Sequence, residues 1–288
     1  MSLRIVTCNV MPHAYAVVAR WVERHGHEIV LLVTSPLGAV ERYGVSYLEL
    51  VEATAPLHQV VVTANLRAAA PLIAAVRPDL LISASFPHRI PASVTAIPRF
   101  GAYNLHPAPL PRGRGPNPLR LIYEGADTAG ATLHQLSPHI DAGAILSRRE
   151  APLPEDFTTE ALYALWDQLC DDVLDEGFAR ALAGEPGLPQ DESLASYAAP
   201  FTPEECWLSW DRPLQLLRKQ AAVLESDALA MLDDQPISIL GLGAEPMEAP
   251  DVPAGTVLDR TDRDAVVRVQ DGVARVTYVP YDAGEQSE

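Results

Sequence analysis

Apolar positions in the first 200 residues occur as short runs separated by amphipathic stretches. The short runs predict strands at residues 3–7, 29–33, 60–62, 80–83, 102–105 and 131–136. Apolar positions at helical spacing predict helices over residues 15–24 and 66–76, of which the second contains Pro71. Strands that alternate with helices are typical of α/β proteins. We therefore predict a doubly wound, Rossmann-like parallel sheet, which binds ligands beyond the carboxyl ends of its strands.

The pattern changes after the longest amphipathic stretch, which begins at Thr158 and ends before Gly184. The chain then becomes rich in proline, glycine, serine and acidic residues, a composition typical of a linker. Beyond it, a helix is predicted over residues 207–223, and strands are predicted at residues 236–240, 256–258, 265–269 and 273–279. We expect three consecutive segments, namely a catalytic α/β domain (1–188), a linker (189–203) and a small β-rich domain (204–288).

The amino-acid composition limits the kinds of molecule that this protein is expected to bind. The 288 residues are 48% hydrophobic, which is enough for a packed core, and their formal net charge is −17. From residue 200 onward the chain carries 17 acidic and 7 basic side chains. A nucleic acid is therefore a disfavoured partner, because its binders place lysine and arginine against phosphates. Three scattered cysteines, the lack of a long apolar run and a start unlike a signal peptide predict a cytoplasmic protein with no membrane partner.

Candidate chemistry concentrates between residues 104 and 145. Asn104 and His106 are two positions apart, so on a strand they point to the same side. Prolines and glycines follow, and Asp141 lies in an Asp-Ala-Gly turn. An amide donor, an imidazole and a carboxylate at strand ends suit acyl transfer to an amine. The same residues could instead cap turns. No glycine-rich dinucleotide fingerprint follows the first strand.

The ordered motif decides between these interpretations. Asn-x-His-Pro at 104–107, Leu-Pro-x-x-Arg-Gly at 110–115, and His134 followed by Asp-x-Gly-x-Ile at 141–145 resemble the signature of the 10-formyltetrahydrofolate-dependent formyltransferases. That family includes methionyl-tRNA formyltransferase and formyltransferases of amino sugars and natural-product amines. The resemblance implies the formyltransferase fold with a C-terminal β-barrel (OB-like) domain, whose start the segment 207–211 resembles.

The resemblance also implies residue roles. Asn104 would donate to the formyl oxygen as the tetrahedral intermediate forms, His106 would stabilise that oxygen and relay a proton, and Asp141 would orient His106 and help accept the proton of the amine. The donor would be 10-formyltetrahydrofolate, with no metal. The residues implied in binding it are Phe86, Pro87, His88, Arg89, Ile90, His139 and Asp141.

The acceptor implied is the primary amine or hydroxylamine of a small molecule, such as an amino sugar or a natural-product amine. The tRNA-directed members carry a long basic insertion after the second strand, whereas residues 34–44 here are short and hold one acid and one base. Their C-terminal domain is basic, and this one is acidic. The residues expected to bind the acceptor are Arg112, Arg114, Pro116 and Asn117.

Other interpretations remain open at the level of sequence. Arg89, Arg112, Arg114 and Arg120 are equally well explained as solvated surface charges. The spacing of His134, His139 and Asp141 fits no standard metal motif, and a structural or orienting role for His134 is favoured. The alternatives to an amine N-formyltransferase are a formyltetrahydrofolate hydrolase, a methionyl-tRNA formyltransferase and a catalytically silent folate-binding module. Neither the acceptor nor the oligomeric state follows from the sequence.

Overall fold

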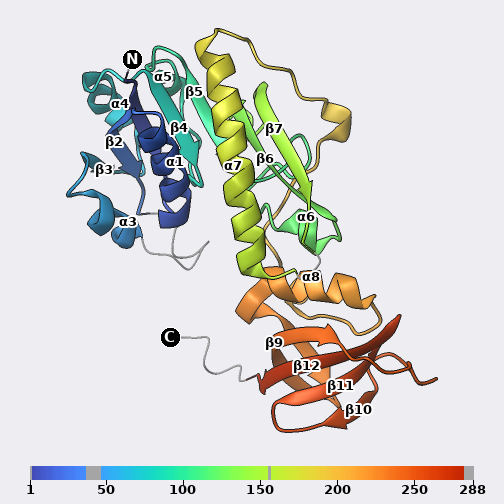
Figure 1. The fold of residues 1–288 in the computed structure, drawn as a ribbon. Coiled ribbons are helices and arrows are strands. Elements are labelled where there is room, and N and C mark those ends of the chain that lie inside the picture. Colours follow the sequence, from blue (N-terminus) through green and yellow to red (C-terminus); the bar gives the residue numbers. More distant parts are fainter. Residues whose placement is uncertain (1, 37–46, 155–156, 282–288) are drawn as a thin grey trace. The chain divides into compact units, whose positions relative to one another are not determined.

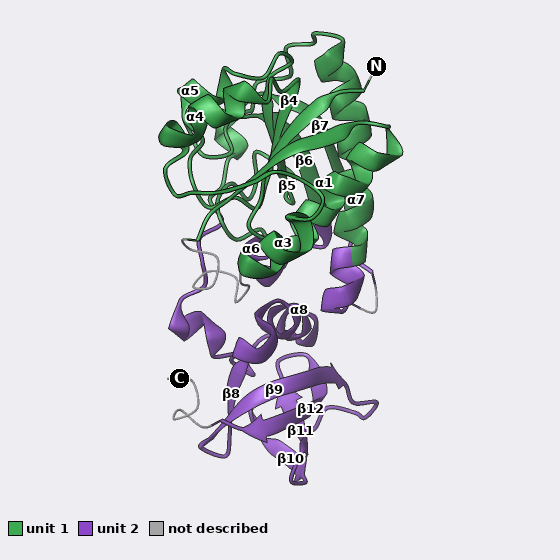
Figure 2. Cartoon of the chain, turned by 90° about the vertical axis from the view of Figure 1, so that its left-hand side faces the viewer, with its two compact units in different colours: residues 1–118, 129–151, 164–197 green, residues 119–128, 152–163, 198–288 purple. Residues whose placement is uncertain are grey.

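The structure is a computed structural model that describes residues 2–36, 47–154 and 157–281 (Figure 1). Most of the stretch 34–44, interpreted above as a short counterpart of the basic insertion, lies outside the described residues. Contacts divide the chain into two compact units (Figure 2). Unit 1 comprises residues 1–118, 129–151 and 164–197, and unit 2 comprises residues 119–128, 152–163 and 198–288. These bounds differ from three consecutive segments, because residues 119–128 and 152–163 belong to unit 2 although unit 1 continues to residue 197.

A seven-stranded sheet in the order β3-β2-β1-β4-β5-β6-β7 forms the frame of unit 1. Its strands are β1 (Arg4–Cys8), β2 (Glu28–Thr34), β3 (Val60–Val62), β4 (Leu80–Ala84), β5 (Ala102–His106), β6 (Thr128–Gln135) and β7 (Ile145–Pro152). The pairs among β1 to β5 are parallel, as predicted for a doubly wound sheet. The order reverses at β1, which lies between β2 and β4, and this creates the switch point where such sheets bind ligands.

One departure from a parallel sheet shapes the site. β6 runs antiparallel to β5, with Asn104 opposite His134 and His106 opposite Thr132. The connection between these strands holds only the four-residue helix α6 (Arg120–Tyr123) among its regular elements, and a right-handed parallel crossover usually needs a longer helix. The carboxyl end of β5 therefore lies beside the middle of β6.

Helices cover both faces of this sheet. α4 (Leu66–Ala75) and α5 (Ala92–Thr95) pack on one face in a cluster with the buried side chains of β1, β2 and β4. α1 (Pro12–Arg24) and α7 (Thr159–Leu182) lie on the other face, where the rings of Trp21 and Phe178 are 4.6 Å apart (Figure 1). A further helix, α3 (Tyr47–Thr54), precedes β3. Pro71 lies inside α4, within its second turn.

Unit 2 contains a five-stranded antiparallel sheet that curls into a half-barrel (Figure 2). Its order is β10-β11-β12-β9-β8, and β10 and β8 are the two edges. The strands are β8 (Leu229–Leu232), β9 (Gln235–Ala244), β10 (Val257–Arg260), β11 (Asp264–Val269) and β12 (Gly272–Pro280). The buried side of the sheet packs against α8 (Leu214–Leu224) around Leu217, Trp210 and Val267. The predicted small barrel domain is thus an open, curled sheet.

Three element predictions require correction. The helix predicted over residues 207–223 begins at Leu214, because Pro213 lacks an amide hydrogen and is tolerated only at a helix start. Trp207 instead forms a bridge to Leu229, and 3₁₀ turns occupy residues 192–194, 203–206 and 225–227. β7 and β8 were not predicted, since their side chains follow no clear alternation. Within the described residues, no helix is long and apolar enough to span a membrane.

Candidate active site

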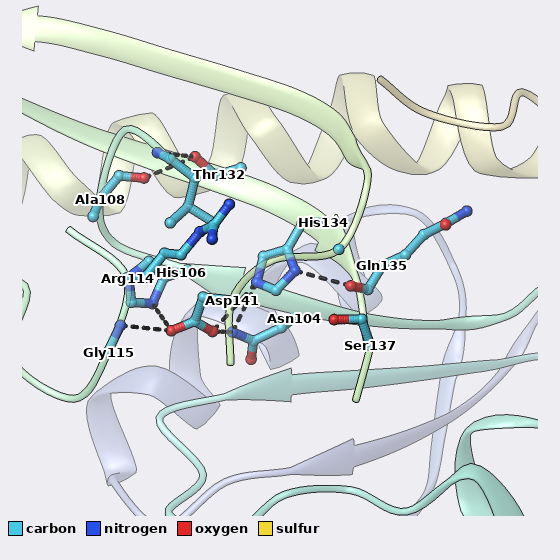
Figure 3. A network of polar contacts seen from close by, with 12 residues as sticks. Asn104, His106, Ala108, Arg114, Gly115, Thr132, His134, Gln135, Ser137 and Asp141 are labelled. Carbon is cyan, nitrogen blue, oxygen red and sulfur yellow. Dashed lines mark hydrogen bonds and ion pairs between the residues drawn. The ribbon is translucent and has the colours of Figure 1, made fainter. Parts of the chain in front are cut away.

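The site begins at the carboxyl end of β5. Asn104 and His106 both belong to this strand, and the His106 side chain is 8% exposed. Opposite them on β6, His134 faces Asn104, and Thr132 faces His106. The Thr132 hydroxyl donates to Ala108 O (2.7 Å) and accepts from Leu110 N (3.2 Å). Thr132 thereby holds the proline-rich loop that follows β5 against β6 (Figure 3).

Asp141 reaches this pair from the turn between β6 and β7. Asp141 has φ 49°, in the left-handed region that is disfavoured for a residue with a Cβ. Gly143 follows in a position where a Cβ would collide with Gln135 O. Gln135 N in turn donates to Ala144 O (2.9 Å). The Asp-Ala-Gly sequence therefore permits a turn tight enough to bring the carboxylate back over β5.

The Asp141 carboxylate contacts four groups (Figure 3). Oδ2 accepts from the backbone N–H of Gly115 (2.8 Å) and lies 3.9 Å from His106 Nδ1. Oδ1 accepts from Asn104 Nδ2 (3.3 Å) and lies 3.5 Å from His134 Nε2. The structure therefore brings together the three residues expected to be catalytic, and it adds His134 and the Gly115 amide.

This environment keeps Asp141 ionised. Burial by itself raises the pKa of the carboxyl. The opposing effects of His106, of His134 and of the Gly115 N–H outweigh burial and hold the pKa well below the ordinary value of 3.8. At neutral pH Asp141 is therefore a fixed negative charge that can stabilise a neighbouring imidazolium.

Hydrogen-bond chemistry assigns the protons of both histidines. His106 Nε2 is 2.8 Å from Gly113 O, and a carbonyl only accepts, so Nε2 carries hydrogen and Nδ1 faces Asp141. His134 Nδ1 is 2.9 Å from Gln135 O and carries hydrogen by the same argument. In the neutral ring His134 Nε2 is thus an acceptor.

The orientation of the Asn104 amide follows from those assignments. Its nitrogen is 3.2 Å from His134 Nε2 and 3.3 Å from Asp141 Oδ1, and both of these atoms accept. Asn104 therefore directs its two N–H groups at His134 and Asp141, while its oxygen points away from both (Figure 3). To donate to a formyl oxygen, Asn104 must exchange one of these two partners.

The loop expected to hold the pterin ring follows β4 and borders a cleft of about 480 Å³. The cleft size lies in the range of small-molecule sites. Ser85 begins the loop with φ 51°, and His88 Nε2 is 2.7 Å from Ser35 Oγ. The lining residues are Ala64, Asn65, Leu66, Arg67, His88, Arg89, Ile90, Pro91, Ala92, Thr95, Leu136, Ser137 and Pro138.

Of the residues expected at the cofactor, His88, Arg89 and Ile90 line this cleft. Phe86 packs against the core and its ring lies edge-on to His88, while Pro87 is half-buried beside it. His139 is exposed just before Asp141, and its carbonyl accepts from Ser137 Oγ (2.8 Å). Sequence reasoning missed Asn65, Arg67 and Ser137, because no motif marks the ends of β3 and β6.

The arginines expected to bind the acceptor are paired with acidic side chains. Arg112 Nη2 is 2.6 Å from Glu150 Oε1. Arg114 binds Glu192 through two N–H groups, at 2.8 and 2.9 Å. Pro116 and Asn117 follow in the same loop and are half-buried. A substrate-binding role for these four residues stays a prediction.

Arg120 lies outside the site. Arg120 belongs to unit 2, where it binds Glu205 and the carbonyls of Ala199 and Pro200. Cys8 is fully buried at the end of β1, and burial raises the pKa of its thiol to about 12, so it is not a nucleophile. No cluster of three or more metal-ligating side chains occurs among the residues that the structure describes.

Comparison with known proteins identifies the family. The family model described as formyl transferase matches residues 11–174. Methionyl-tRNA formyltransferase of Thiobacillus denitrificans is 30% identical over 298 aligned positions, which cover 99% of this chain and 93% of the relative. HypX of Aquifex aeolicus, solved in complex with tetrahydrofolic acid, shares the fold with a TM-score of 0.68 at 17% identity. That match covers 97% of this chain, which spans 46% of the HypX chain.

A second solved structure matches over its full length. WlaRD, described as a sugar 3N-formyl transferase and solved with dTDP and 5-N-formyl-tetrahydrofolate, has a TM-score of 0.65 at 12% identity. The match covers 98% of this chain and 100% of WlaRD. The family model covers more than half of the present chain, and the Thiobacillus denitrificans relative is 30% identical over nearly the whole of both chains. This chain belongs to the formyl transferase family.

Proposed function

We propose that this protein transfers the formyl group of 10-formyltetrahydrofolate to a primary amine or hydroxylamine of a small molecule. The observation that carries the proposal is the convergence of Asn104, His106 and Asp141 at the carboxyl end of β5. Family membership supports the reaction class, and the folate-bound structures of relatives with this fold support the donor.

The cleft beside β4 fits the pterin part of the donor. Ile90 and Leu136 offer apolar surface, while Ser137, His88 and backbone groups offer hydrogen-bond partners. Residues 136–138 line this cleft and lead directly into the Asp141 turn. The bound donor supplies an N-formyl group as the electrophile, and the chain's own residues supply orientation and proton transfer.

His106 is placed to manage a proton. Its Nε2–H is committed to Gly113 O, so the Nδ1 lone pair is the basic position. An amine with a pKa near ~10 is mostly protonated at neutral pH and must lose a proton before it can attack. His106 Nδ1 can take that proton, and the imidazolium is then stabilised by the Asp141 carboxylate 3.9 Å away. The imidazolium can return the proton to the folate nitrogen as the bond from the formyl carbon to that nitrogen breaks, which releases tetrahydrofolate and the formamide.

Asn104 is placed to stabilise negative charge on the formyl oxygen. One of its N–H groups can move from His134 Nε2 or Asp141 Oδ1 to that oxygen with a small side-chain rotation. The other N–H keeps its protein partner and holds the amide in place. Such a donor is worth most where water is excluded, and Asn104 is half-buried.

Charge supports a small acceptor over tRNA. The chain has a net charge of −17, and residues 200–288 hold 17 acids against 7 bases. A polyanion would be repelled by such a surface, whereas a cationic amine would be attracted. Within the described residues, Arg112, Arg114 and Arg120 are all neutralised by glutamates.

The second candidate is methionyl-tRNA as the acceptor. It is favoured by the 30% identity to a methionyl-tRNA formyltransferase that extends over both units. The two candidates differ in salt dependence, because tRNA binding weakens steeply with salt and binding of a small amine does not.

The test measures tetrahydrofolate release from 10-formyltetrahydrofolate with a panel of acceptors. The panel holds amino-sugar nucleotides, ornithine derivatives, polyamines and charged initiator tRNA. Release that depends on a small amine and is abolished in Asn104→Ala supports the proposal. Release only with tRNA supports the second candidate, and rapid release with no amine indicates a hydrolase. Folate binding without any release indicates a silent module. His106→Asn should likewise abolish amine-dependent release, because the basic ring nitrogen is lost. Its matched control is His58→Asn, which alters a histidine outside the site.

A further inference from the structure

The segment after α7 was predicted to be part of a linker, yet it is bonded to the site. Ile145 and Leu188 exchange two backbone hydrogen bonds of 2.8 Å each, which fixes the segment beside the Asp141 turn. Further along, Ser196 Oγ accepts from Gly113 N (2.9 Å), and Gly113 O is the partner of His106. We refer to residues 188–197 as the strap. The strap contacts both pieces of backbone that orient the catalytic side chains.

Gln190 makes the central contact of the strap. Its Nε2 donates to Asp141 O (2.7 Å) and to Gly143 O (2.8 Å), which are carbonyls on both sides of the turn. Its Oε1 accepts from Arg114 Nε (3.1 Å) and Nη2 (2.8 Å). A guanidinium only donates, so Arg114 forces Gln190 to present its amide nitrogen to the carbonyls.

Arg114 is itself held by Glu192. The two side chains form a bidentate pair with distances of 2.9 and 2.8 Å, and the Arg114 side chain is only 12% exposed. A bidentate pair fixes the plane of the guanidinium. Glu192, Arg114 and Gln190 therefore form one chain of hydrogen bonds that ends on the Asp141 turn.

This turn requires support. Asp141 has a left-handed backbone conformation, and its carboxylate must stay within reach of both Gly115 N and His106 Nδ1. A strained backbone conformation persists only where its surroundings determine it. The two hydrogen bonds from the Gln190 side chain to the carbonyls of Asp141 and Gly143 stabilise this conformation.

We propose that Gln190, oriented by Arg114 and Glu192, is a positioning residue for the transfer reaction. It holds the Asp141 carboxylate against His106 and Gly115 without touching the reacting groups. This inference rests on the proposed function for its kinetic consequences. It also gives Arg114 a role that differs from binding an acceptor.

The main test replaces Gln190 with glutamate. Gln190→Glu keeps the shape and the partner Arg114, but it presents a carboxylate oxygen instead of N–H groups to the two carbonyls. A displacement of about 1 Å in a catalytic group costs up to about 100-fold in rate, so kcat should fall about 10- to 100-fold. KM for the formyl donor should change less than about three-fold, since the cleft is untouched. Gln190→Leu, which also lacks the donor, should behave in the same way.

The matched control is Ser193→Ala in the same strap. The Ser193 hydroxyl donates to Asp191 Oδ1, so Ser193→Ala leaves the hydrogen bonds of Gln190 in place and its kcat should equal that of the wild type. Arg114→Met distinguishes the two roles of Arg114. If it acts through Gln190, kcat falls and the double variant with Gln190→Glu is no worse than Gln190→Glu alone. If Arg114 binds the acceptor, KM for the acceptor rises and the two effects add, which would contradict the inference.

Hydrogen–deuterium exchange gives a readout that needs no turnover. Backbone amides of residues 111–118 and 137–146 should exchange at least about ten-fold faster in Gln190→Glu, because the Gly115 N–H loses its fixed acceptor. They should be unchanged in Ser193→Ala. A wild type that is inactive with every acceptor would reject the proposed function, and exchange would still test the strap. An active wild type with unchanged kcat and exchange in Gln190→Glu would reject the strap alone.

Discussion

Asn104 and His134 face each other across the antiparallel β5–β6 ladder, with 3.2 Å between Asn104 Nδ2 and His134 Nε2. The Nδ1–H of His134 is held by Gln135 O, so Nε2 accepts from Asn104 when the ring is neutral. This contact, together with the one to Asp141, sets the orientation of the Asn104 amide. His134 is therefore a hydrogen-bond partner of the Asn104 amide, and its orienting role stays a prediction.

Asn104→Ala should lower kcat for amine-dependent tetrahydrofolate release by about 10²- to 10³-fold, because one donor to the developing oxyanion is lost. Binding of tetrahydrofolate, measured by calorimetry, should stay close to that of the wild type, since Asn104 does not line the cleft. A variant that retained more than about a tenth of kcat would contradict this role for Asn104.

His134→Phe should destabilise the protein as well as slow it. The ring still fills its buried position, but one Asn104 N–H loses its acceptor. An unsatisfied buried donor costs about 1–3 kcal/mol, which urea unfolding would detect. His134→Gln keeps an acceptor and is the matched control. Equal stability of the two variants would show that the Asn104–His134 contact contributes little.

The lowered pKa of Asp141 should make the stability of the protein fall in acid. Its folded-state pKa is below the ordinary 3.8, so its stabilising contribution is complete above that value and is lost as the pH falls through the folded pKa. The free energy of unfolding should therefore fall more steeply below pH ~4 in the wild type than in Asp141→Asn. Parallel curves for the two proteins would mean that Asp141 has the same pKa folded and unfolded.

In unit 2, Glu205 should also make the stability of the protein depend on pH. Its hydrogen bonds to Arg120 and to Thr202 N lower its pKa to about 2. The sign is the same as for Asp141, so the stabilisation is present above the unfolded pKa of 4.5 and fades as the pH falls towards 2. Glu205→Gln should thus lower the melting temperature at pH 7 but have a smaller effect at pH 3. A constant difference between wild type and variant at both pH values would refute the linkage.

Gly143→Ala tests the tight turn. A Cβ at this position collides with Gln135 O, so the turn must open and move Asp141 away from His106. We expect a loss of kcat of at least about ten-fold. Gly243→Ala is the matched control, because a Cβ at Gly243 meets no atom within 4 Å. The two variants should separate clearly in activity, and similar kinetics would argue against a rigid turn.

Much of the fold follows from local sequence patterns. The buried apolar runs of β2 and β4 and the helical spacing of α1 and α7 each contain enough information to predict the element. The boundary of α8 does not follow in this way. Apolar residues continue at helical spacing before it, but Pro213 confines the helix to residues after it, and Trp210 Nε1 donates to Met231 O instead.

Some features of the site also follow from local sequence, and others do not. Asn104 and His106 share a face because side chains on a strand alternate, and this holds wherever the strand lies in the protein. The Asp-Ala-Gly turn can also be predicted from the sequence, and only glycine fits at position 143, where a Cβ would collide with Gln135 O. The sequence alone thus determined the shared face of Asn104 and His106, the family indicated by the motif and the acidic composition, while the catalytic role of Asn104, His106 and Asp141 stays a prediction.

Tertiary structure decided the rest. The antiparallel direction of β6, which places His134 opposite Asn104, depends on how a 21-residue connection packs and has no local signal. Gln190 lies in a segment whose composition is that of a linker, yet it bonds to carbonyls 47 and 49 residues away in the chain. Contacts of that kind are selected by the three-dimensional arrangement of backbone donors and acceptors, because a hydrogen bond depends on distance and angle and not on sequence separation.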